Sequence, residues 1–127
     1  MRSVDTNVLV RAFLNDVAEQ YEIAREVLAR PLLVTTTVVL ELVWVLTSSR
    51  RQTREEVVAN LRDLLEVRHI VFADAAAVSW ALERYADGGD FADMLHLALS
   101  RGASSFVTFD QGIARHAVGS PVPVETL

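Results

Sequence analysis

The sequence predicts a three-layer α/β/α domain with a central, mainly parallel sheet flanked by helices. Short apolar segments alternate with helix-like segments along all 127 residues, without repeats or a recognisable linker. Strands that alternate with helices form βαβ units, which make the strands parallel and place helices on the faces of the sheet. The hydrophobic fraction of 51% is enough for an ordinary core. We therefore expect residues 1–127 to form a single domain.

The expected strands are short apolar runs that end at polar or turn-forming residues. The first runs from the N-terminus into Asp5-Thr6-Asn7, residue types that bond nearby backbone and cap a following helix. If this strand is central, Asp5 lies at its carboxyl end, where parallel α/β folds bind ligands. The later expected strands are Leu32–Val34, His69–Phe72, Ser105–Phe109 and, at an edge beside prolines, Val122–Val124.

Most of the expected helices begin at capping residues, and three of them end at Pro31, Gly88-Gly89 or Gly102. Asp16 and Thr53 each precede a glutamate by three residues, which is the spacing of a capping box. A polar loop is expected at Ser48–Gln52. The expected helices are Val8–Leu14, one from Asp16 to about Ala29, Val38–Leu46, one from Thr53 to about Val67, Ala75–Tyr85, one from Asp90 to near Gly102, and Asp110–His116.

Composition narrows the class of protein. The net charge of -5 argues against sequence-independent binding of nucleic acid by the protein's own charge. The absence of cysteine excludes disulfides and thiolate chemistry, and it suits a reducing cytoplasm. No signal peptide is visible, and the longest apolar stretch, Val34–Leu46, is too short to span a bilayer. We expect a soluble, cytoplasmic protein that does not insert into a membrane.

Glu41 is the most informative carboxylate, because its neighbours from Val38 to Leu46 are otherwise apolar. A buried, ionised carboxylate needs a cation, a metal or a solvent-lined cleft. An internal ion pair with an arginine is the structural alternative. The position of Glu41, one turn into a helix that follows a strand, favours a functional site.

The expected topology of the sheet suggests a shared role for three further carboxylates. Asp5 and Asp110 end expected strands, and Asp93, like Glu41, lies in the first turn of an expected helix. Each alone is consistent with an ordinary helix cap or with a favourable helix-dipole contact. In a parallel sheet, however, all four positions lie on one side of the molecule. One shared acidic pocket is therefore the better explanation.

Clustered carboxylates raise one another's pKa and need a counterion. A set of oxygen ligands without cysteine suits a hard divalent cation, Mg²⁺ or Mn²⁺. Such ions serve phosphoryl chemistry, in which one activates water and another stabilises the leaving oxygen. The positive charge of the metal would also reconcile an acidic protein with a nucleic-acid substrate.

The chain resembles PIN-domain ribonucleases, most closely the toxin component of VapBC-type toxin–antitoxin pairs. The resemblance covers the whole chain and rests on four segments, which are Val4–Leu9, the helix with Glu41, Asp90–His96 and Thr108–Asp110. It implies that a metal site is formed by Asp5, Glu41, Asp93 and Asp110, that Thr6, Asn7 and Thr108 support it, and that Asp90 is an additional carboxylate. It also implies a homodimer that cleaves RNA with Mg²⁺ or Mn²⁺ and is inhibited by a cognate antitoxin protein.

Other classes fit the sequence less well. A phosphoacceptor receiver domain needs an adjacent acidic pair after the first strand and a lysine near the site, and the chain has neither. A dehalogenase-type phosphatase would have a second aspartate where Asn7 stands, and a nucleotide-binding protein would have a glycine-rich phosphate loop. A PIN-type nuclease that is not a toxin, or a non-catalytic interaction module with a bound metal, remains as an alternative.

Several other residues have ordinary structural explanations. Arg50, Arg51 and Arg54 could bind phosphates, but a solvated face is the simpler expectation. Trp44, Trp80 and Phe91 occupy helical positions typical of a core or a dimer interface, and His96 is expected to be a helix residue with satisfied hydrogen bonds.

Overall fold

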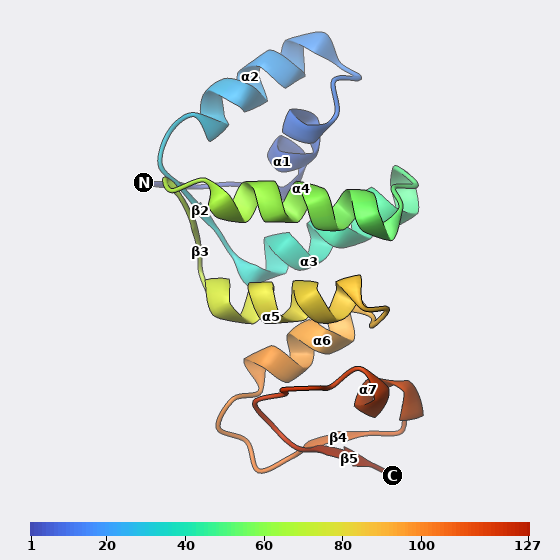
Figure 1. The fold of residues 1–127 in the computed structure, drawn as a ribbon. Helices are drawn as coiled ribbons and strands as arrows, with labels where there is room; N and C mark the ends of the chain where they lie inside the picture. Colours follow the sequence, from blue (N-terminus) through green and yellow to red (C-terminus); the bar gives the residue numbers. More distant parts are fainter. The chain divides into compact units, whose positions relative to one another are not determined.

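The computed structural model describes residues 1–127, which form two compact units, Met1–Ala75 and Ala76–Leu127 (Figure 1). Each unit combines parallel strands with helices, which confirms the predicted α/β class with parallel strands flanked by helices. None of the helices is long and apolar enough to cross a membrane.

The first unit contains a three-stranded parallel sheet of β1 (Arg2–Ser3), β2 (Leu32–Val34) and β3 (Ile70–Phe72), in that order. Figure 1 shows these short strands beside the N-terminus. The middle strand, β2, pairs with β1 at Ser3↔Leu33 and with β3 at Leu33↔Val71. Leu32 and Val34 are completely buried. Within this sheet β1 is an edge strand, so the conditional expectation of a central first strand is not met there.

The helices of the first unit connect these strands. α1 packs against both α2 and α3. The Thr53 capping box is confirmed, because the Thr53 hydroxyl accepts the Glu56 N–H at 3.2 Å and Glu56 Oε1 accepts the Thr53 N–H at 3.2 Å. The helical elements are α1 (Thr6–Phe13), α2 (Ala18–Leu28), α3 (Thr36–Trp44), the π-helical turn η1 (Val45–Ser49) and α4 (Arg54–Glu66).

The capping box predicted at Asp16 is wrong. α2 begins at Ala18 without a side-chain cap. The Asp16 carboxylate instead accepts hydrogen bonds from Arg11 at 3.2 Å and from Arg50 at 2.6 Å. A charge-assisted bond to a guanidinium is stronger than a bond to a neutral backbone N–H. Asp16 therefore joins the α1–α2 loop to the turn after η1.

The predicted polar loop Ser48–Gln52 is shorter than expected, because the helical chain continues through η1 to Ser49. The Thr47 hydroxyl donates to the Val43 carbonyl oxygen at 2.8 Å, inside the same helical segment. The apolar residues of α3 and η1 that face the interior are fully or nearly buried: Val39, Leu42, Val43 and Leu46.

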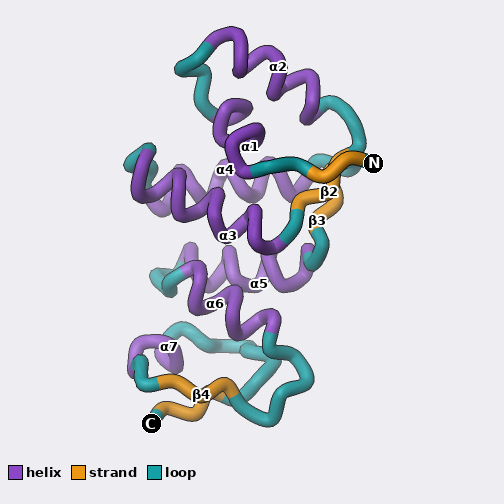
Figure 2. The backbone as a smooth tube through the Cα atoms, turned by 180° about the vertical axis from the view of Figure 1, so that it is seen from behind, coloured by secondary structure: helices purple, strands orange, loops and turns teal.

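The second unit contains the remaining helices and a two-stranded parallel sheet (Figure 2). Its elements are α5 (Ala75–Ala86), α6 (Phe91–Leu99), β4 (Phe106–Thr108), α7 (Gln111–Arg115) and β5 (Val124–Thr126). The last strand begins two residues later than predicted. Pro123 lacks an N–H and contributes only its carbonyl oxygen, which accepts the Phe106 N–H at 2.7 Å.

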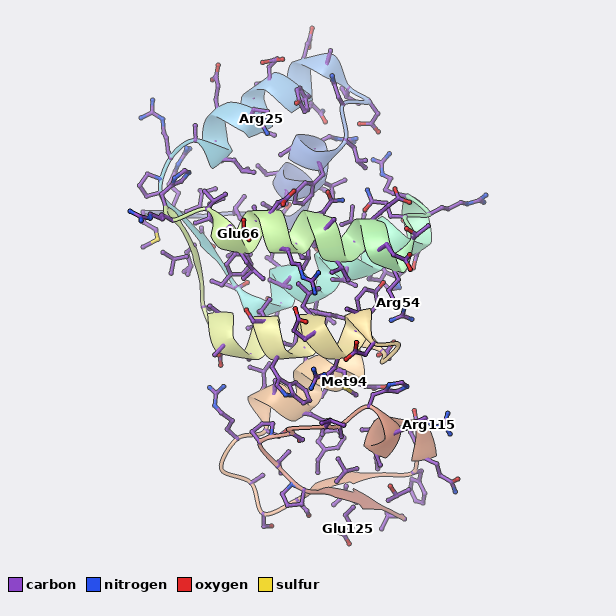
Figure 3. The ribbon with its side chains drawn as sticks, viewed as in Figure 1. Arg25, Arg54, Glu66, Met94, Arg115 and Glu125 are labelled. Carbon is purple, nitrogen blue, oxygen red and sulfur yellow. The ribbon has the colours of Figure 1, made fainter.

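The core of the second unit includes Phe91, as predicted. Phe91 is 3% exposed, and its ring meets Tyr85 edge-on with 6.0 Å between the ring centroids. Met94, labelled on α6 in Figure 3, is also buried. Trp80 is half-buried, and the Arg84 guanidinium lies 5.7 Å from the centroid of its ring. The ring contact between Tyr85 and Phe91 connects α5 with the start of α6.

Candidate acidic metal site

Asp5 follows β1 and is the N-cap residue of α1, but its side chain makes no capping hydrogen bond. The carboxylate is exposed. Extending the register of β1 and β2 beyond Ser3↔Leu33 brings Asp5 level with Thr35, the N-cap residue of α3. The starts of α1 and α3 therefore meet at the carboxyl edge of this sheet, which is the edge that the sequence predicted for a ligand site.

The two polar neighbours of Asp5 differ from each other. Thr6 is 2% exposed, and its hydroxyl oxygen is buried without a hydrogen-bond partner. Leaving such a group unpaired costs about 1–3 kcal/mol. Asn7 is exposed and lines an open groove with Val8 and Arg11. Stability alone does not explain the Thr6 hydroxyl.

Glu41 differs from the expectation in two respects. Because α3 begins at Thr36, Glu41 lies in the second turn, and the first turn contains no acidic residue. Glu41 is also exposed rather than enclosed by its apolar neighbours, which face the interior from the other side of α3. It forms no ion pair with an arginine. The predicted burial and the alternative of an internal ion pair are both wrong, and Glu41 is an accessible carboxylate.

The second unit brings three acidic residues into electrostatic contact. Asp90 is the N-cap residue of α6, and its Oδ2 accepts the Asp93 N–H at 3.0 Å. Desolvation raises the pKa of Asp93, the charges of Asp90 and Asp110 raise it further, and His96 opposes the shift. Asp93 lies in the first turn of α6, as predicted. Two like charges thus act on a half-buried carboxylate.

Asp110 both caps a helix and belongs to this cluster. Its Oδ1 accepts the Gly112 N–H at 2.7 Å at the start of α7. Its own N–H donates to the Thr108 hydroxyl at 2.9 Å. Thr108 therefore fixes the backbone from which the Asp110 carboxylate extends. Arg115, labelled in Figure 3, lies at the other end of α7.

The donor set fits a hard divalent cation. Asp90, Asp93 and Asp110 supply only carboxylate oxygens, and none of the three is paired with an arginine. Desolvation is the largest cause of the raised pKa of Asp93, the charges of Asp90 and Asp110 raise it further, and a cation would relieve the repulsion between these carboxylates. Three acidic or histidine side chains do not converge on one point in the structure. A single pocket formed by Asp5, Glu41, Asp93 and Asp110 thus stays a prediction.

Trp44 lies on the protein surface beside Glu41, which the sequence did not predict. Trp44 was expected in a core or a dimer interface, but its side chain is 62% exposed. It follows Glu41 by three residues, so the two side chains are neighbours on the surface of α3. That spacing was the available signal, although it does not reveal which face of the helix is exposed.

Parallel strands flanked by helices, with carboxylates where strands end and helices begin, define the class of α/β proteins. The family model for the PIN domain matches residues 3–119. The chain belongs to the PIN domain family. PIN domains are generally nucleases, so this is a nuclease-type fold. No curated protein matches the chain.

Proposed function

We propose that the chain is a metal-dependent endoribonuclease and that residues 1–127 act as one PIN-like nuclease domain. The observation that carries this proposal is the Asp93 carboxylate, half-buried beside Asp90 and Asp110 without a compensating arginine. Stability does not favour such an arrangement, whereas a bound cation does. The match of the PIN family model to residues 3–119 supports a nuclease function.

In this proposal Asp5, Glu41, Asp93 and Asp110 hold Mg²⁺ or Mn²⁺. When bound, the cation supplies activation of water and stabilisation of the leaving oxygen of a phosphodiester. The chain's own residues orient the carboxylates. Asp90 holds the first turn of α6 through the Asp93 N–H, and the Thr108 hydroxyl holds the Asp110 N–H.

We further infer that the protein is a cytoplasmic toxin of a type II toxin–antitoxin pair, active as a homodimer. The order and spacing of the four acidic segments support this inference. A small antitoxin would insert an arginine or lysine among the carboxylates, where a basic side chain replaces the cation and forms charge-assisted bonds. A PIN nuclease without an antitoxin is the alternative, and an adjacent short reading frame for a DNA-binding protein would distinguish the two.

The decisive experiment measures cleavage of single-stranded RNA by the purified protein with Mg²⁺ or Mn²⁺ and with EDTA. We expect cleavage only with the metal, and none by Asp5→Asn or Asp93→Asn. Asp63→Asn is a matched control, because Asp63 is an exposed aspartate in α4 outside the predicted site. Cleavage that persists in EDTA, or full activity of Asp5→Asn, would contradict the proposal. Loss of the fold in EDTA would instead indicate a structural ion in a non-catalytic module.

A further inference from the structure

Trp44 stands beside Glu41 on the exposed side of α3. Its side chain is 62% exposed, although tryptophan usually buries most of its large apolar surface. Residues three apart are neighbours on a helix surface, and their separation along the axis is about 4.5 Å. An aromatic face is therefore available one helical turn from a predicted metal-binding carboxylate.

The surface around Trp44 is polar. The exposed residues of α3 and η1 are all polar apart from Trp44, and they are Thr37, Glu41, Trp44, Ser48 and Ser49. The first four recur at helical spacing and form one stripe. A face that binds another protein usually presents a contiguous apolar patch. A single aromatic ring among polar groups is instead typical of a platform on which a nucleobase stacks.

Arg51 lies two residues after the end of η1, which is the element that carries the last residues of this stripe. The Arg50 N–H donates to the Val45 carbonyl oxygen at 3.1 Å, and the Gln52 N–H donates to the Leu46 carbonyl oxygen at 2.9 Å. These two bonds hold the intervening Arg51 against the end of the helical segment.

The side chain of Arg51 has no partner within the protein. Arg50 is neutralised by Asp16 at 2.6 Å, whereas Arg51 is exposed and forms no ion pair or hydrogen bond. Arg51 also has a φ of 53°, and it is the only residue other than glycine with a positive φ. A free guanidinium at a fixed backbone position suits a phosphate group.

We propose that Trp44 and Arg51 bind single-stranded RNA beside Glu41, with Trp44 stacked on a base and Arg51 on a backbone phosphate. This inference rests on the proposed ribonuclease activity. The substrate is single-stranded because the base faces of a duplex are already stacked on one another and cannot reach a side chain. Trp44 and Arg51 are positioning residues, which hold the RNA while the carboxylates serve the reaction.

Phe109 is also exposed, at 82%, and it precedes Asp110. Its surroundings differ from those of Trp44. The pairing Thr108↔Thr126 places Phe109 beside Leu127, and Val107 lies two residues earlier on the same face of β4. These neighbours are 61% and 54% exposed. Such an apolar group is more typical of a protein interface, so Phe109 is not part of the proposed RNA-binding surface.

The first test measures the affinity for a labelled single-stranded RNA in EDTA, in the Asp93→Asn background, so that the RNA stays intact. Loss of one stacked base corresponds to about fivefold or more in Kd, which is the effect expected of Trp44→Ala. Trp44→Phe should retain most of the affinity. Ile23→Ala is the matched control, because Ile23 is also 62% exposed. Arg51→Gln should reduce the salt dependence of binding by about one ion, whereas Arg30→Gln should not.

The second test uses fluorescence and does not depend on catalysis. The sequence contains 2 tryptophans, so Trp80→Phe leaves Trp44 as the sole tryptophan, and excitation at the red edge of its absorption avoids emission from tyrosine. Single-stranded RNA should quench this emission to saturation, and a duplex of the same sequence should not. Unchanged emission at saturating RNA, or unchanged RNA affinity of Trp44→Ala, would overturn the proposal. If Trp44→Ala instead converted a dimer to a monomer with unaltered RNA affinity, Trp44 would belong to a protein interface.

These outcomes are separable from a failure of the proposed function. Activity in EDTA or in Asp5→Asn would refute metal-dependent cleavage but would leave the binding measurements intact. Conversely, strictly metal-dependent cleavage together with full RNA affinity of Trp44→Ala would refute only the stacking role.

Discussion

Replacing Asp93 by asparagine should separate two effects of the acidic cluster, its destabilisation of the fold without metal and its stabilisation of the fold by bound metal. The substitution nearly preserves shape, and the backbone N–H of residue 93 can still donate to Asp90 Oδ2. It removes the desolvation of the charged carboxylate, which is the largest cause of the raised pKa of Asp93, and the repulsion from Asp90 and Asp110, which raises that pKa further. Two carboxylates about 4 Å apart repel by roughly 1 kcal/mol in water, and pairs exposed to solvent are screened to about 0.2–1 kcal/mol.

An opposing contribution comes from the helix dipole of α6, because Asp93 lies in its first turn. A negative charge at that position stabilises a helix by about 0.3–1 kcal/mol. The two repulsions, from Asp90 and from Asp110, together come to about 0.4–2 kcal/mol, so central values of the opposing terms leave a net gain of about 0.5 kcal/mol for Asp93→Asn in EDTA. A gain of that size would raise Tm by roughly 2 °C in a domain of this length.

Metal should reverse the order of stability. At a metal concentration of about 100 times Kd, the parent should gain about 2.7 kcal/mol, and Asp93→Asn should gain much less. The assay consists of thermal melts of both proteins in EDTA and in millimolar Mn²⁺. Asp63→Asn, with its substitution on an exposed face of α4, should respond to Mn²⁺ as the parent does.

The pH dependence of the stability difference between Asp93→Asn and the parent tests whether the charge of Asp93 destabilises the fold. Because the folded-state pKa of Asp93 is raised, its contribution to stability is fully present below the unfolded pKa of about 3.9 and is lost as the pH rises through the folded value. The advantage of Asp93→Asn in EDTA should therefore disappear in acid. A clear loss of stability on Asp93→Asn in EDTA at neutral pH would refute the reasoning and assign Asp93 to the scaffold.

Three further substitutions test other parts of the site and fold. Thr6→Val should raise the free energy of unfolding in urea by about 1 kcal/mol, because it removes a buried hydroxyl without a hydrogen-bond partner, and it should lower RNA cleavage. A loss of stability would mean that the hydroxyl has a hydrogen-bond partner in solution. Desolvation alone would raise the pKa of Asp16, but the hydrogen bond and the charge of Arg50 lower this pKa overall. Asp16 therefore stabilises the fold above its unfolded pKa, and this stabilisation is lost as the pH falls through the folded pKa. Asp16→Asn should thus destabilise the protein at pH 7 but not in strong acid, and equal destabilisation at both pH values would exclude the ion pair as the cause. The double variant Asp5→Asn, Asp93→Asn should bind the antitoxin more weakly than the parent in a titration, and equal affinity would exclude insertion of a basic side chain among the carboxylates.

Features determined by nearby residues were predictable from the sequence. The strand Leu32–Val34 was predicted with its observed bounds, because a short apolar run that follows Pro31 and ends at three threonines is typical of a buried strand. The Thr53 capping box was also found, since both of its hydrogen bonds join residues three apart. The same pattern at Asp16 failed because Arg50, 34 residues away in sequence, provides a stronger partner. Local spacing cannot indicate which distant charge competes for a cap.

The misplacement of Glu41 has a different physical origin. The expected helix began at Val38, but Thr35 is the N-cap residue and the helix starts at Thr36. The apolar neighbours of Glu41 were correctly identified, yet burial of one face of α3 leaves the opposite face exposed even in a strongly apolar helix. Composition indicated that the helix packs against a core, but it did not indicate how far the buried face extends around the helix.

The sequence offers helix capping and metal binding as alternative explanations of these carboxylates, but in the structure a capping carboxylate still acts on its neighbours through its charge. Asp90 and Asp110 each cap a helix with one oxygen and also act electrostatically on Asp93. A cap fixes a carboxylate in position without consuming its charge. Asp5 is different, because it occupies an N-cap position and makes no capping bond. Its removal should therefore cost little stability, and a loss of cleavage in Asp5→Asn cannot be attributed to a weakened helix.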